Sequence, residues 1–246
     1  MVDTSVSTAV ILAAGLGTRL SGVTNGLIPK GLLPVNGRTL VERSLDKLER
    51  HGIRRTIIVT GHLNTFYDQL ARRRPGVETV RNSDYADTGS MASLAVAAPL
   101  IGGPFLLLES DLIYEDRALR LLQESSLEDA ILISGFTHSD DEVFIEVDGA
   151  RVARMSKKRS DLQNILGELT GLNKVSLPLL AKAVELGRSQ PLKQYHYEYA
   201  LTDASATRPV GYVYISDLIW AEIDDAQHLE RVERSLIPRL KALGEE

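Results

Sequence analysis

The sequence predicts an α/β fold: a Rossmann-like, mixed and mostly parallel sheet flanked by helices, with a small lobe in the second half. Three observations support this prediction. The length of 246 residues suits one domain, 1–246. Short apolar segments alternate with helical ones in the first half, which is typical of parallel sheets covered on both faces. Gly15, Asn82 and Asp111 end three of these segments, where the carboxyl ends of parallel strands form binding sites.

The first half alternates strands and helices in regular order. Apolar or β-branched runs predict strands over 10–15, 56–62, 77–82 and 104–111. Apolar residues at helical spacing predict helices over 38–53, 65–73 and 90–100. The first of these helices is expected to stop at Gly52, and the last near Pro99.

The second half is less regular. Apolar runs predict strands over 131–136, 208–216 and 218–224. The segment 142–156 is expected to form a hairpin that turns at Asp148 and Gly149. Helical spacing predicts helices over 177–186 and 228–243. No linker or repeat divides the chain, so we expect one domain.

The composition excludes several classes of protein. The chain has 28 basic and 33 acidic residues, a net charge of −5, and no cysteine. We therefore expect no nucleic-acid partner, since affinity for phosphate backbones comes from clustered Lys and Arg. Thiol catalysis, disulfides and Cys-ligated metals are excluded. No apolar run is long enough to span a membrane and no signal-peptide pattern is present, so we expect a cytoplasmic protein without membrane insertion.

The strongest motif is AAGLGTRL (13–20) followed by PKGLLPV (29–35). It is neither a dinucleotide fingerprint nor a Walker A loop. Gly15 and Gly17 would let backbone N–H groups approach an anion, and Arg19 and Lys30 would add positive charge. These features predict a phosphate site. The alternative is a tight strand-to-helix turn with surface cations.

The two motifs resemble the LAAGxGTR and PKxLLPV signature of sugar-nucleotidyltransferase-like enzymes. Those enzymes have an α/β fold and transfer NMP from an NTP onto a phosphate, with release of pyrophosphate. The resemblance implies that Arg19 and Lys30 are catalytic, with Lys30 at the α-phosphate. It also implies a nucleotide site made by Leu12, Ala13, Ala14, Gly15, Gly17 and Thr18.

Carboxylates in two distant segments are candidate metal ligands. Asp111 ends an apolar run, and Asp224 and Asp225 follow Trp220. Two such carboxylates can hold one Mg²⁺, which prefers oxygen ligands and would neutralise charge on the phosphates. We expect Asp111 and Asp224 to bind the metal and Asp225 to cap the final helix. The alternative for Asp111 is also a helix cap.

A closer resemblance covers nearly the whole chain. The segments TGHLNTFYDQLA, NSDYADTGSMASL, FLLLESDLIYE, SGFTHSDDEVFIE, SKKRSDLQNILGEL and HYEYAL are similar to cytidylyltransferases that act on 2-aminoethylphosphonate, and to the related phosphocholine enzymes. This resemblance implies CTP as donor and Mg²⁺ as cofactor. Gly89 and Ser90 replace the tandem Asn of many phosphocholine enzymes, which favours the phosphonate branch. With Asn82 and Thr88, they are expected to line the nucleotide site.

The acceptor needs recognition at two ends. Lys157 is the candidate for its phosphonate. Glu198 and Tyr197 are candidates for its ammonium, because a primary ammonium donates hydrogen bonds to carboxylates. Tyr195, Tyr197 and Tyr199 keep phosphocholine as an alternative, since a trimethylammonium binds ring faces. Asp141 and Glu142 are weaker carboxylate candidates.

We therefore expect a cytidylyltransferase that makes CMP-2-aminoethylphosphonate, with a nucleotide-binding half at about 1–125 and a small acceptor-binding lobe at about 126–246. The first alternative acceptor is phosphocholine, giving CDP-choline, and myo-inositol phosphate or a sugar phosphate is a more distant alternative. A protein of another class, a non-catalytic nucleotide binder, would be expected to have lost one of Gly15, Arg19, Lys30, Asp111 and Asp224. Apolar segments of the second half could form a homodimer face or cover the cleft.

Overall fold

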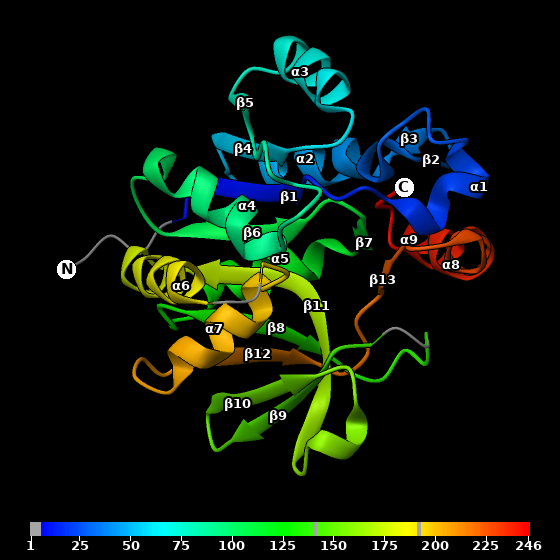
Figure 1. Cartoon of the computed structure of the whole chain (residues 1–246). Helices are drawn as coiled ribbons and strands as arrows, with labels where there is room; N and C mark the ends of the chain where they lie inside the picture. The colour runs from blue at the N-terminus through cyan, green and yellow to red at the C-terminus, as the bar shows by residue number, and fades with distance from the viewer. Residues whose placement is uncertain (1–5, 140–141, 191–192) are drawn as a thin grey trace.

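A central mixed sheet organises the chain (Figure 1). The computed structural model describes residues 6–139, 142–190 and 193–246. Within them a nine-stranded sheet has the order β10-β9-β11-β6-β1-β4-β5, with β8 and β12 attached beside β11. None of the helices in these three stretches is long and apolar enough to cross a membrane.

The first half forms the parallel part of the sheet. Its strands are β1 (Thr8–Ala13), β4 (Arg55–Thr60), β5 (Val77–Arg81) and β6 (Phe105–Glu109). Its main helices are α2 (Leu40–Arg50), α3 (Asn64–Arg73), α4 (Ser90–Ala97) and α5 (Asp116–Glu124). The predicted strands and helices of this half are all present, whereas α5 was not predicted. Short elements complete it: α1 (Ser21–Thr24), β2 (Pro34–Val35), β3 (Arg38–Thr39) and β7 (Leu112–Tyr114).

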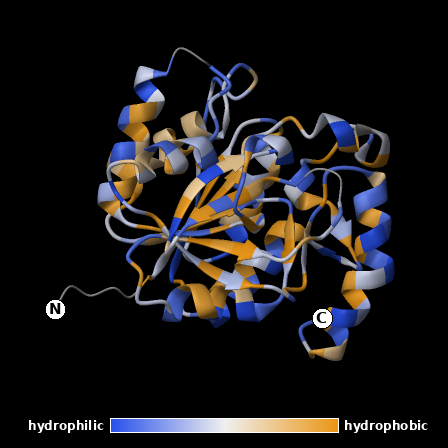
Figure 2. Ribbon diagram, turned by 90° about the horizontal axis from the view of Figure 1, so that it is seen from below, coloured by the Kyte–Doolittle hydropathy of each residue, from blue (hydrophilic) through white to orange (hydrophobic). Residues whose placement is uncertain are grey.

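Alternate residues of β1 enter two different apolar cores. Val10 and Leu12 pack with residues of α4, α6 (Leu177–Ser189) and α7 (Tyr197–Ser205). Ala9 and Ile11 pack with residues of α2, α3 and α5. Figure 2 shows the strands as a mainly hydrophobic centre between helices whose outer faces are hydrophilic. Because side chains alternate along a strand, a wholly apolar strand is required when both faces are covered.

A long strand that the sequence analysis missed joins the two halves. β11 (Ile165–Val175) runs antiparallel to β6, β8 (Ala130–Ser134) and β9 (Phe144–Asp148). The predicted hairpin is present as β9 and β10 (Arg151–Ser156), and β12 (Gly211–Ile215) pairs parallel with β8. Only β11 and β10 run against the other described strands of this sheet. The prediction of a mixed, mostly parallel sheet flanked by helices is therefore confirmed.

The final segment returns to the first half. β13 (Trp220–Glu222) pairs antiparallel with β7, and Ile223 N donates to Asp111 O at 3.1 Å. The single helix predicted over 228–243 is instead α8 (Ala226–Arg231), a π-helical turn and α9 (Ile237–Ala242). Pro238 interrupts the helix because it has no N–H to donate. This segment packs on a third apolar core with Leu20, Val35 and Ile113.

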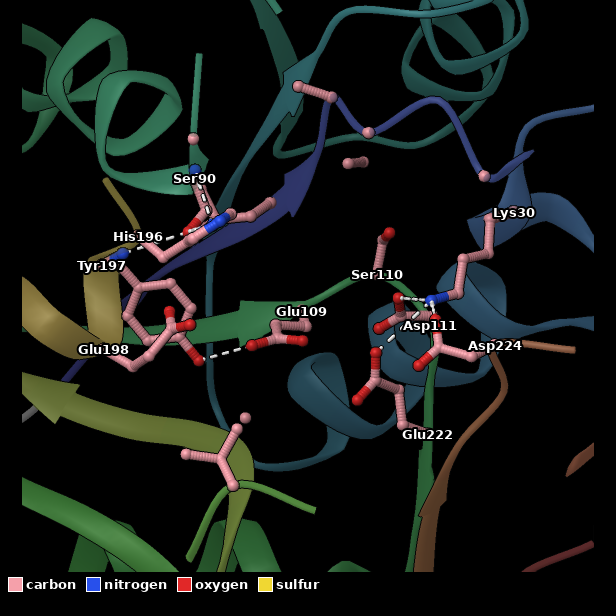
Figure 3. A pocket seen from close by; sticks show the side chains of 18 of the residues that line it. Lys30, Ser90, Glu109, Ser110, Asp111, His196, Tyr197, Glu198, Glu222 and Asp224 are labelled. Carbon is pink, nitrogen blue, oxygen red and sulfur yellow. Dashed lines mark hydrogen bonds and ion pairs between the residues drawn. The ribbon is translucent and has the colours of Figure 1, made fainter. Parts of the chain in front are cut away.

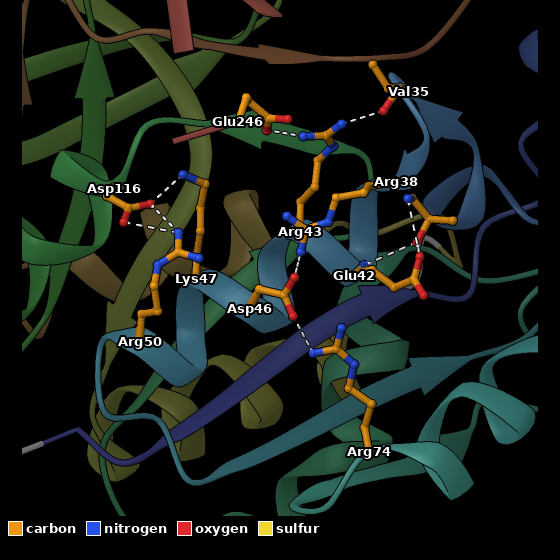
Figure 4. Close-up of polar contacts among 11 residues, drawn as sticks. Val35, Arg38, Glu42, Arg43, Asp46, Lys47, Arg50, Arg74, Asp116 and Glu246 are labelled. Carbon is orange, nitrogen blue, oxygen red and sulfur yellow. Dashed lines mark hydrogen bonds and ion pairs between the residues drawn. The ribbon is translucent and has the colours of Figure 1, made fainter. Parts of the chain in front are cut away.

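Two cations of α2 are buried beneath the last residues of the chain (Figure 4). Lys47 forms ion pairs with Asp116 and with Glu245, the latter at 2.6 Å. Arg43 pairs with Glu246 and also donates to Val35 O. These contacts attach the end of the chain to α2.

Candidate active site

A cleft of about 710 Å³ lies at the carboxyl ends of β1 and β6. Its walls come from the loop after β1, the start of α4, β11, the start of α7, and β13 (Figure 3). Nearly all of the site residues predicted from the sequence line this cleft. Those are Leu12, Ala13, Ala14, Gly15, Gly17, Thr18, Arg19, Lys30, Thr88, Gly89, Ser90, Asp111, Lys157, Tyr197, Glu198 and Asp224.

The glycine loop has the backbone shape that its sequence predicts. Gly17 has a φ of +62°, and a Cβ there would lie 3.3 Å from Lys30 Cβ. A side chain would therefore be strained and crowded at this position. No atom in the described part of the chain lies within 4 Å of the position of a Cβ on Gly15, so the backbone there faces open space. This loop can bring a large anion close to its peptide groups.

Lys30 is held inside a cage of carboxylates. Its Nζ forms ion pairs with Asp111 and Asp224, and with Glu222 at 3.4 Å. Burial alone would lower the pKa of Lys30, but the three carboxylates outweigh it and raise the pKa above its usual value. Arg19 adds a second cation, with its guanidinium 2.9 Å from Asp224 Oδ1.

The donor set fits Mg²⁺. Asp111 Oδ1 and Asp224 Oδ2 are buried and accept no hydrogen bond from the described residues, although the other oxygen of each binds Lys30. Buried carboxylate oxygens without a partner are costly, and a hard cation would satisfy them. Oxygens of Glu109, Asp111 and Glu222 also lie within 4.8 Å of one another.

Glu109 and Glu222 were missed by the sequence analysis. Each precedes a predicted ligand by two residues, in Glu-Ser-Asp (109–111) and Glu-Ile-Asp (222–224). Residues two apart in an extended segment point to the same side, so this repeated spacing was a usable signal. Burial, and then repulsion from Asp111 and Glu198, raises the pKa of Glu109 to about 8. Burial and the neighbouring carboxylates likewise raise the pKa of Glu222 well above its usual value.

The start of α7 is attached to the start of α4. Tyr197 N donates to Ser90 Oγ at 3.0 Å, and Gly89 N donates to Lys193 O at 2.9 Å. A Cβ on Gly89 would lie only 2.2 Å from Tyr195 O. Gly89 is therefore required for this close approach, and Ser90 caps the first turn of α7 from another part of the chain.

The acceptor candidates lie together at this end of the cleft. Tyr197 OH donates to Glu109 Oε1 at 2.6 Å. Burial raises the pKa of Glu198, and the charges of His196 and Lys157 oppose that increase. Glu142 lines the cleft and accepts from Ser139 N.

Three other predicted residues have different positions. Asn82 does not line the cleft: it is buried, and its amide donates to Thr88 and Ser93, both at 3.1 Å, so it supports the wall. Asp225 caps α8 as predicted, accepting from two backbone N–H groups at 2.8 Å. Asp141 lies outside the described residues.

Comparison with known proteins gives consistent results. The family model of the MobA-like NTP transferase domain matches residues 9–181. The chain is 30% identical over 161 residues to the 2-aminoethylphosphonate cytidylyltransferase of Lancefieldella rimae, covering 65% of this chain and 64% of that protein. It is 37% identical over 99 residues to the choline-phosphate cytidylyltransferase of Streptococcus pneumoniae, covering 40% and 42%. The matches thus span less than two thirds of either relative.

A solved structure supports the fold. The inositol-1-phosphate CTP transferase from T. maritima superposes with a TM-score of 0.83 at 21% identity, covering 96% of this chain and 97% of the other. At this identity the likeness concerns the fold alone. It agrees with the mixed, mostly parallel sheet described above.

Proposed function

The chain belongs to the MobA-like NTP transferase family, and from this premise we propose that it transfers CMP from CTP to 2-aminoethylphosphonate. The products are CMP-2-aminoethylphosphonate and pyrophosphate. The Lancefieldella rimae relative is named as a cytidylyltransferase of 2-aminoethylphosphonate, which supports this choice. The observation that carries the proposal is the position of Lys30, which lies beside the glycine loop and contacts Asp111 and Asp224 in the same cleft.

The triphosphate of CTP binds the loop 13–19 through backbone N–H groups, Arg19 and Lys30. An oxygen of the acceptor phosphonate attacks the α-phosphorus in line and forms a new P–O bond. The bond from the α-phosphorus to the bridging oxygen breaks, and its electron pair leaves with pyrophosphate. The acceptor is already an anion, so no general base is required. Catalysis then consists of positioning and charge neutralisation.

Asp111 and Asp224 are the residues that would hold Mg²⁺, which supplies positive charge at the phosphates. The oxygens that would face the metal, Asp111 Oδ1 and Asp224 Oδ2, are not the ones that contact Lys30. The flexible side chain of Lys30 can direct its charge to the phosphates of the nucleotide.

The acceptor lies between the two halves, 1–125 and 126–246. Lys157 binds its phosphonate, and the carboxylates near α7 bind its ammonium. The residues that line the cleft come from both halves, which supports this division.

Phosphocholine is the second candidate acceptor. Tyr199 and His196 line the cleft with ring centroids 6.2 Å apart, and Tyr199 also lies 6.5 Å from Tyr195. Such rings can hold a trimethylammonium by cation–π contacts.

The test is pyrophosphate release with Mg²⁺ and either CTP or UTP, with 2-aminoethylphosphonate or phosphocholine as acceptor. We expect turnover with CTP and at least a tenfold higher kcat/KM for the phosphonate. A higher kcat/KM for phosphocholine would assign the second function. No turnover with either acceptor would contradict both.

A further inference from the structure

Glu109 lies near the middle of the cleft, between two groups of site residues (Figure 3). It ends β6, two residues before Asp111, and lies between the carboxylates around Lys30 and the start of α7. Its Oε1 accepts from Tyr197 OH at 2.6 Å. Among the described residues Oε2 accepts no hydrogen bond, so this oxygen is available to a ligand in the cleft.

The charges that face Glu109 differ from those that face Glu198. Glu198 is faced by Lys157 and His196, which already offer it positive charge. Glu109 is faced mainly by the like charges of Asp111 and Glu198. The cation that faces it, Lys30, is bound by Asp111 and Asp224. Glu198 therefore already has two cations beside it, whereas the cation near Glu109 is held by other carboxylates.

A primary ammonium matches this position. It donates up to three hydrogen bonds and can contact Oε2 directly. A trimethylammonium has no N–H to donate and binds ring faces instead. Tyr197 presents its hydroxyl to Glu109, whereas the ring pairs at this end of the cleft are Tyr195–Tyr199 and His196–Tyr199.

The spacing of the site suits a short acceptor. A Glu109 oxygen lies within 4.8 Å of oxygens of Asp111 and Glu222. A two-carbon linker places a nitrogen about 4–5 Å from a phosphorus, given bond lengths of about 1.5 Å. A phosphonate whose ammonium contacts Glu109 is therefore within about one linker length of the carboxylates around Lys30, where the α-phosphate is proposed to bind.

We propose that Glu109, and not Glu198, is the specificity-determining carboxylate, that it accepts hydrogen bonds from a primary ammonium of the acceptor, and that Tyr197 positions it. This inference rests on the proposed function.

The experiment compares three acceptors: 2-aminoethylphosphonate, its N-trimethyl analogue and ethylphosphonate, which lacks the amine. Pyrophosphate release gives KM and kcat for each, and calorimetry gives the affinity for 2-aminoethylphosphonate in the presence of CTP. The variants are Glu109→Gln, Glu198→Gln and Tyr197→Phe. Glu146→Gln, on β9 outside the cleft, is the matched control.

We expect the wild-type protein to prefer 2-aminoethylphosphonate to both other acceptors. Glu109→Gln should raise its KM about 10–100-fold, as expected for a lost hydrogen bond between charged groups, and should abolish the preference for an amine. The KM for CTP should stay within about twofold, which also shows that the variant is folded. Tyr197→Phe should raise the acceptor KM less than Glu109→Gln does. It should keep the preference for an acceptor with an amine, because the Glu109 carboxylate is still present.

Two results contradict the inference in different ways. If Glu109→Gln keeps the amine preference and Glu198→Gln loses it, the inference is wrong and the proposed function remains. If the wild-type protein turns over none of the three acceptors, the proposed function fails and the inference fails with it.

Discussion

Replacing Lys30 by Met should destabilise the metal-free protein and make its stability depend on Mg²⁺. The Lys30 side chain is 14% exposed, and its partners Asp111 and Asp224 are 11% and 5% exposed. Removal of one partner from a buried ion pair costs about 3–5 kcal/mol, because the remaining charges are uncompensated. In the variant Mg²⁺ can compensate the same two carboxylates. It should restore about 2.7 kcal/mol at a concentration 100-fold above its Kd.

Urea unfolding in EDTA and in Mg²⁺ measures both effects. In the wild-type protein Lys30 competes with the metal, so Mg²⁺ should stabilise it less than it stabilises the variant. Lys182→Met is the control, since Lys182 pairs with Glu185 on the surface of α6 and such pairs contribute about 0–1 kcal/mol. A loss below about 1 kcal/mol in Lys30→Met, or an equal effect of Mg²⁺ on both proteins, would refute the reasoning.

Three further predictions concern α7 and Glu109. Ser90→Ala removes the oxygen that accepts from Tyr197 N, a loss of about 1 kcal/mol, so the acceptor KM should rise about fivefold and more than the CTP KM. Ser90→Thr should restore the acceptor KM, and steady-state kinetics that show an equal rise in both KM values would contradict this role. Gly89→Ala places a Cβ 2.2 Å from Tyr195 O, so we expect a lower Tm by calorimetry, and an unchanged Tm would contradict the close approach. In the ligand-free protein the pKa of Glu109 is raised from 4.5 to about 8, so its neutral form is favoured there, whereas a bound ammonium would favour the ionised form. Its contribution to stability is complete below about pH 4.5 and is lost as the pH rises through about 8, by at most about 1.4 kcal/mol per pH unit. Urea midpoints in EDTA between pH 5 and 9 should therefore decline less in Glu109→Gln, and equal slopes would count against a raised pKa.

The nucleotide half was predictable because its signals are local. The strand before the glycine loop is apolar from Ala9 to Ala13, and Gly17 adopts the positive φ that favours glycine. Lys30, Asp111 and Asp224 lie in recognisable sequence contexts, and the structure brings them together in one cleft.

The missed elements depend on contacts between distant residues. The segment of β11 has a mixed polar and apolar sequence, yet the strand is mostly buried, and several of its polar side chains have hydrogen-bond partners in other elements. Thr170 donates to Leu132 O at 3.0 Å, and Lys174 donates to Ser125 O at 2.9 Å. No pattern within 165–175 reveals these partners. α7 was missed for a related reason, since the serine that caps it lies more than a hundred residues earlier.

Glu109 and Glu222 were missed for a different reason. The sequence shows both Glu-x-Asp pairs, but only the pairing of β13 with β7 places them in one cluster. Each Glu-x-Asp pair considered alone does not predict a carboxylate cluster, because the cluster forms only when the two distant segments pair.

The pairing of β13 with β7 also has a consequence for folding. Glu222 and Asp224 reach Asp111 through a closure of more than a hundred residues, which is slow to form relative to local contacts. The parallel strands and their helices can assemble before that closure, but the carboxylate cage around Lys30 cannot. Recovery of the proposed transferase activity after dilution from denaturant should therefore lag behind recovery of helical circular dichroism. Assembly of the carboxylates around Lys30 would therefore report on the last step of folding.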